Sequence, residues 1–113
     1  MLSARTSGEA EFFVENPEIE EMVISITKCE SESLPDRWGD CDKTGIKNAK
    51  HCKALGIAQF HTKSFDWMKK LANMPELDRN KTADQLTLLR WVLLKLPDDT
   101  LARHWTCYRK IYK

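Results

Sequence analysis

The fold is decided by residues 82–96, whose sequence is TADQLTLLRWVLLKL. Through this stretch, apolar side chains occupy nearly every face of a helix, and such a helix belongs in the middle of a domain. Thr82 is a residue type that caps helices, and Pro97 prevents the helix from continuing. The stretch therefore predicts a central buried helix around which the rest of a small domain packs.

Three further helical segments are predicted on either side of it. Asn16 followed by Pro17 is a favourable helix start, and apolar residues then recur at helical spacing. The later segments are indicated by apolar spacing together with capping residues and terminating prolines. The predicted ranges are about 17–31, about 62–74 and about 98–105.

Residues 32–55 have a different composition, since proline, glycine, Asp and Asn interrupt any helical period. We predict a loop or a small irregular hairpin region here. Residues 1–14 are interpreted as a flexible lead-in, which leaves one domain at 15–113. The predicted fold class is therefore mainly α, an α+β fold in which one irregular excursion follows the first helix.

Composition narrows the function classes. The chain has 113 residues and a net charge of +1, so it can form one domain and has no overall field that would attract nucleic acid. Its apolar runs are too short to span a bilayer. Residues 1–13 lack the unbroken apolar segment of a secretory signal, so we expect a mature chain or another export route.

Four cysteines allow two disulfides in three connectivities. If they are oxidised, we expect Cys41–Cys52 to close one loop and Cys29–Cys107 to tie the first helix to the C-terminal segment. Free buried thiols are one alternative. Zinc is another, because two histidines lie near Cys41 and Cys52, although the chain has no C-x-x-C pair.

One carboxylate interrupts the apolar stripe of the first helix. Ile19, Val23, Ile26 and Glu30 fall at i, i+4, i+7 and i+11, which places Glu30 on the core-facing side at the C-terminal end. Burial and the negative end of the helix dipole both raise the pKa of such a group. A protonated carboxyl can donate to a leaving glycosidic oxygen. The alternative is that Glu30 extends into solvent at the helix end.

Neighbouring residues add a resemblance. Residues 26–31 (ITKCES) resemble the Glu-Ser motif that closes the first catalytic-domain helix of soluble lytic transglycosylases and goose-type lysozymes. Residues 56–59 (GIAQ) are similar to the Gly-x-x-Gln motif that follows in those proteins. Residues 84–86 and 91–93 resemble their long buried helix. The ending at 104–108 (HWTCY) resembles the Trp-Ser-Cys close of small secreted lysozyme-like domains.

The resemblance covers residues 17–110 and implies a lysozyme-like fold and a peptidoglycan-cleaving muramidase. The bond cut would be the β-1,4 link between N-acetylmuramic acid and N-acetylglucosamine, by hydrolysis or by transglycosylation with a 1,6-anhydro product. Glu30 would be the general acid, and Ser31 would bind near it or near substrate. Gly56 would let the backbone approach the glycan, and Gln59 would bind sugar unless it caps nearby backbone instead.

Other residues complete the expected site. Trp38 is a candidate cleft wall, and His61 could line the cleft or cap the following helix. Tyr108 could replace the aromatic part of a Tyr-Asn motif that this chain lacks. The candidates for a second catalytic carboxylate are Asp36, Asp40 and Asp42.

The implied partner is the glycan strand of peptidoglycan, met outside the cell or in the periplasm. We expect a monomer with no cofactor, no metal, no nucleic-acid partner and no membrane span. The alternative function is a small helical binding module, disulfide-stapled or zinc-bound, that uses its basic C-terminal surface at 103–110. A third hypothesis is a lysozyme-like fold that binds glycan without cleaving it.

Overall fold

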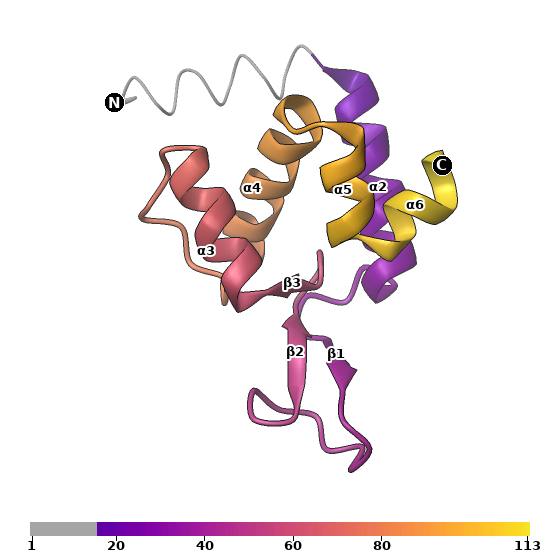
Figure 1. Ribbon diagram of the computed structural model, residues 1–113, viewed down its shortest axis with the longest axis vertical. Coiled ribbons are helices and arrows are strands. Elements are labelled where there is room, and N and C mark those ends of the chain that lie inside the picture. The colour runs from indigo at the N-terminus through magenta and orange to yellow at the C-terminus, as the bar shows by residue number, and fades with distance from the viewer. Residues whose placement is uncertain (1–15) are drawn as a thin grey trace.

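Helix α4, Thr82–Lys95, is the buried centre of the helical region, as its sequence predicts. In the computed structural model, which describes residues 16–113, the side chains of Leu88, Leu89 and Val92 have no solvent exposure. Helix α2, Pro17–Ser31, packs along α4 (Figure 1). The predicted bounds of both helices are confirmed to within a residue or two.

The C-terminal segment folds as two short helices rather than one. Helix α5, Asp98–His104, ends at Trp105, whose extended backbone separates it from α6, Thr106–Tyr112. The Trp105 side chain is buried and makes an edge-to-face contact with Phe60, with ring centroids 5.3 Å apart. The break therefore places a large aromatic ring in the core.

A three-stranded antiparallel sheet follows α2. Its strands are β1, Trp38–Cys41, β2, Cys52–Leu55, and β3, Phe60–His61, in the order β1-β2-β3. The β1–β2 hairpin projects beyond the helices, and β3 leads directly into α3, Thr62–Leu71 (Figure 1). The hairpin interpretation is confirmed, and the described chain is a small, helix-rich α+β structure.

Two disulfides are present, with the expected pairing. Cys29–Cys107 joins the last turn of α2 to the first turn of α6, and Cys41–Cys52 bridges directly paired residues of β1 and β2. The free-thiol alternative is therefore wrong, and these cysteines offer no thiolate to zinc. Disulfides are typical of chains that fold in an oxidising compartment.

Three expectations concern the N-terminal segment, a membrane span and a metal site. The predicted lead-in, residues 1–14, lies outside the described residues. Between residues 16 and 113, none of the helices has both the length and the apolar character that crossing a bilayer requires. Over the same range, no three side chains of His, Cys, Asp or Glu are grouped so that they could hold a metal ion.

Candidate active site

The turn between β2 and β3, residues 56–59, is held by buried side chains from distant parts of the chain. From α4, the Gln85 carboxamide accepts the Ala58 N–H at 3.0 Å and donates to the Leu55 carbonyl at 2.9 Å. The Trp105 indole N–H donates to the Ala58 carbonyl at 2.8 Å. These bonds satisfy backbone groups that water cannot reach, so they fix the position of the turn.

Ser31 also helps to hold this turn in place. Its hydroxyl lies 2.7 Å from the Ile57 carbonyl, to which it donates, and the residue has no exposed surface. The expected bond of Ser31, near Glu30 or near substrate, thus goes to a backbone carbonyl, and contact with substrate finds no exposed surface on this residue. Instead, Ser31 ties the end of α2 to the turn and so fixes the position of Glu30, the residue before it.

Gly56 is also required by the fold rather than by a ligand. Its φ of +89° lies in the left-handed region, and an added Cβ would lie 2.2 Å from Gln85 Nε2. The residue is buried, and the expected approach of its backbone to a glycan stays a prediction. The glycine is needed because the Gln85 carboxamide occupies the space beside it.

The Gln59 side chain caps nearby backbone, which is the alternative weighed against sugar binding. Its Nε2 donates to the carbonyls of Arg37 and Gly56, both at 2.9 Å. Gln59 is nevertheless half-buried and lines a small hollow beside His61. Contact with a sugar through its remaining surface stays a prediction.

Glu30 lies in the last turn of α2 and is half-buried. Burial raises its pKa above the ordinary value, and the negative charge of Asp40 acts in the same direction. The Cys107 N–H, 2.9 Å from Oε2, and the charge of Lys110 oppose that rise. Because Cys107 is bonded to Cys29, the disulfide holds this donor against the carboxylate.

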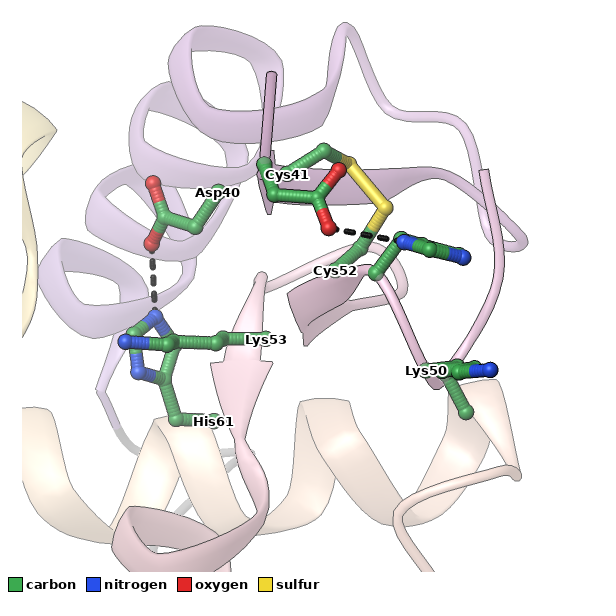
Figure 2. Close-up of a pocket in the computed structure, with 9 residues that line it drawn as sticks. Asp40, Cys41, Lys50, Cys52, Lys53 and His61 are labelled. Atoms are coloured by element: carbon green, nitrogen blue, oxygen red, sulfur yellow. Dashed lines mark hydrogen bonds and ion pairs between the residues drawn. A yellow bond between two sulfur atoms is a disulfide. The ribbon is translucent and has the colours of Figure 1, made fainter. Parts of the chain in front are cut away.

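Among the three candidate second carboxylates, Asp40 is the one whose charge acts on Glu30. Asp40 ends in a carboxylate 2.6 Å from His61 Nε2, and Figure 2 shows this pair at one side of the hollow. Asp40 also has a φ of +51°, an uncommon conformation for a residue with a side chain. His61 therefore uses its ring to bind Asp40, and makes no side-chain cap on α3.

Asp42 and Asp36 are placed differently. The Asp42 carboxylate accepts from Thr44 Oγ1 at 2.5 Å and lies 2.7 Å from His51 Nδ1. These hydrogen bonds lower the pKa of Asp42, with that from Thr44 the larger cause. Asp36 is exposed between α2 and β1. The structure thus brings Asp40, and not all three, toward the candidate acid.

The two aromatic candidates, Trp38 and Tyr108, also lie in different environments. Trp38 is half-buried on β1, paired with Leu55 of β2, and its role as a cleft wall stays a prediction. Tyr108 is buried, and its hydroxyl donates to the Asp98 carboxylate. Burial and then that hydrogen bond raise the pKa of Tyr108 to about 12. Little of Tyr108 is exposed and its hydroxyl is engaged by Asp98, and contact with substrate stays a prediction.

Three hollows meet at His61, which lines all of them. The largest, about 610 Å³, is lined by the hairpin residues Asp40 and Asp42, and Figure 2 shows Asp40 and Lys50 on opposite sides of it. The second, about 90 Å³, reaches Gln59 and His104, and the third, about 480 Å³, lies beside α3. Glu30 is not among the residues that line them, and Asp40, whose charge acts on Glu30, lines the largest.

Sequence reasoning missed several residues that shape this region. Gln85 and Trp105 hold the turn, but each reads as an ordinary member of an apolar helix or segment. Lys53, Lys63 and Arg79 line the third hollow, yet exposed basic residues are common and carry no motif. Their roles follow only from the elements that the fold brings together.

Comparisons of the chain with family models, with curated proteins and with solved structures give no match. Two features of the chain bear on its function. One is the geometry around Glu30, and the other is the resemblance of residues 26–31 and 56–59 to motifs of lysozyme-like enzymes.

Proposed function

We propose that the chain cleaves peptidoglycan glycan strands at the β-1,4 bond between N-acetylmuramic acid and N-acetylglucosamine, with Glu30 as general acid. The observation that carries the proposal is the environment of this carboxyl. It is half-buried, its pKa is raised chiefly by burial, and it is held by one backbone donor. A glycosidic leaving oxygen needs a proton, and a raised pKa favours the protonated form of the carboxyl that supplies it.

Asp40 supplies the second carboxylate of this proposal. Glu30 donates its proton to the bridging oxygen while the bond from that oxygen to the anomeric carbon breaks, and positive charge develops on the sugar ring. Asp40 is exposed and negatively charged near Glu30, so it can stabilise that charge. His61, 2.6 Å from the Asp40 carboxylate, restricts its orientation.

Two outcomes complete the reaction. Water can attack the anomeric carbon and return a proton to Glu30, which gives hydrolysis. Alternatively, the 6-hydroxyl of the muramic sugar attacks internally and returns its proton to Glu30, which gives a 1,6-anhydro product. The second product is lighter than the first by one water, so a mass measurement distinguishes them.

The decisive experiment is digestion of purified walls by the parent chain and by Glu30→Gln. Glutamine keeps an acceptor for the Cys107 N–H but has no proton to give. Activity should fall by about 10²- to 10⁴-fold, the usual contribution of a general acid. The matched control is Glu32→Gln, two residues away, exposed and ion-paired with Arg37, which should retain activity within about twofold.

Equal activity of Glu30→Gln and the parent would remove Glu30 from the mechanism. Sedimentation of the parent with walls, without release of fragments, would instead favour glycan binding without cleavage. The disulfide-stapled binding module remains the alternative function, since the zinc-bound form has lost its cysteine ligands. The proposed substrate lies outside the cell or in the periplasm, and the two disulfides support such an oxidising location.

A further inference from the structure

The hollow beside α3 has an unusual charge pattern. Its cationic residues come from three elements: Lys53 from β2, Lys63 from the first turn of α3, and Arg79 from the segment between α3 and α4. No carboxylate is among the residues that line it, and the first turn of α3 contains no acidic residue. We call this feature the basic hollow, and its volume of about 480 Å³ can accept part of a polymer.

The charges of the basic hollow are not neutralised by the described part of the chain. Between residues 16 and 113, neither Lys53 nor Lys63 lies within ion-pair distance of a carboxylate, and both are exposed. Asp66 acts on Arg79 through its charge alone, and its carboxylate lies 3.8 Å from Lys69 Nζ. Three cationic residues thus line one hollow and form no ion pair with the described residues, although Lys53 also lines the largest hollow with Asp40 and Asp42.

Arg79 is held in place before any ligand arrives. Its Nη1 donates to the Phe60 carbonyl at 2.7 Å and to the Lys53 carbonyl at 3.2 Å. The guanidinium has further N–H donors on the same rigid plane, and a fixed guanidinium is suited to two-point recognition of carboxylate or phosphate. The flexible lysines on either side can then add charge without fixed geometry.

We propose that the basic hollow binds an oxyanion, carboxylate or phosphate, carried by the polymer whose glycan bond is cut. The proposal rests on the proposed function, because His61 lines this hollow and also binds Asp40 beside Glu30. An acidic group of the polymer would therefore be held to one side of the scissile bond. The hollow would favour acidic wall polymer over neutral glycan of the same β-1,4 linkage, such as chitin.

The test uses binding, so that it does not depend on catalysis. In the Glu30→Gln background, Lys53→Gln/Lys63→Gln removes two charges from the basic hollow. The matched control, Lys70→Gln/Lys81→Gln, removes two charges from exposed lysines that do not line it. Affinity for walls at low salt should fall by about five- to tenfold for the first pair and by less than about twofold for the control.

Neutral chitin is the second ligand in this test, and its binding should be the same for all three proteins. The difference on walls should also shrink as salt is added, since exposed charges are screened. Equal losses for the two lysine pairs, or an equal loss on chitin, would overturn the proposal. If the parent does not cleave walls, the proposed function fails, while the wall-binding comparison still decides on the hollow.

Two treated walls identify the source of the oxyanion. Amidation with carbodiimide and an amine removes carboxylates, and hydrofluoric acid removes phosphodiester polymers. The difference between the two lysine pairs should disappear on the first wall if the ligand is a carboxylate, and on the second if it is a phosphate. A difference that persists on a wall given both treatments would overturn the proposal.

Discussion

The turn at 56–59 and the hairpin tip at 42–51 are both irregular and both rich in polar contacts, yet they are built in opposite ways. The turn is held by buried side chains 26, 27 and 47 residues away in the sequence. In the tip, Asp42 and Asn48 bind groups two to nine residues away, and these contacts are exposed. Water can replace the second set but not the first.

This difference indicates which polar residues determine the site. A buried hydrogen bond that loses one partner leaves a desolvated group unsatisfied, whereas an exposed one exchanges its partner for solvent. Because the Ser31 hydroxyl bonds to the Ile57 carbonyl of the turn, the turn fixes the position of Glu30, the preceding residue, relative to the sheet. The tip is free to vary in detail while it supports Asp42 and the wall of the largest hollow.

The largest expected effect separates the two disulfides, one beside each region. Removal of Cys29–Cys107, whose partners have a sequence separation of 78, should cost about 4.5 kcal/mol of unfolding free energy in the chain-entropy treatment. Removal of Cys41–Cys52, with a separation of 11, should cost about 2.8 kcal/mol. Denaturant unfolding of the two double Cys→Ala variants measures both values. Equal losses of unfolding free energy would mean that the hairpin tip is held as strongly as the region around the turn at 56–59.

Two glycines with positive φ give the next effect. Gly56→Ala puts a Cβ 2.2 Å from Gln85 Nε2, and should cost about 3 kcal/mol because it adds strain and disturbs buried hydrogen bonds. Gly45→Ala, in the tip, meets no atom within 4 Å and should cost only the strain of its φ of +75°, about 1 kcal/mol. Thermal unfolding of the pair provides the comparison. A similar shift in Tm for both would contradict the role assigned to Gln85.

The smallest effect is a difference in the direction in which stability depends on pH. It compares two carboxylates, Glu30 near the turn and Asp42 in the tip. The pKa of Glu30 is raised, so the stability linked to its protonated form is present below the unfolded value of 4.5 and is lost as pH rises through the folded pKa. The pKa of Asp42 is lowered, so its contribution is present above the unfolded value of 3.8 and is lost as pH falls.

Glu30→Gln should therefore gain Tm relative to the parent as pH is raised from acid to neutral. Asp42→Asn should lose Tm relative to the parent over the same rise. Calorimetric scans between pH 3 and pH 7 measure both differences. Tm differences that change with pH in the same direction would show that the environments of the two carboxylates are not opposed.

Short-range patterns in the sequence predicted much of this structure. The helices α2 and α4 and the half-buried position of Glu30 follow from the order of apolar residues along the chain, whereas the disulfide pairing was one of three connectivities that the four cysteines allow. The roles of Ser31, Gly56 and Tyr108 do not follow from that order, because each depends on a partner that only the tertiary structure brings near. The choice of Asp40 over Asp42 likewise depends on the register of β1 against β2, which a sequence without strand partners cannot supply.

The dependence of the turn on Trp105 has a consequence for biosynthesis. A ribosome releases the chain from the N-terminus, so α2 and the hairpin emerge long before the indole that bonds to Ala58. The turn cannot be fully held, nor Glu30 receive its Cys107 donor, until nearly the whole domain has left the exit tunnel. The geometry proposed for catalysis therefore forms late, because it needs a chain that has been synthesised as far as Cys107.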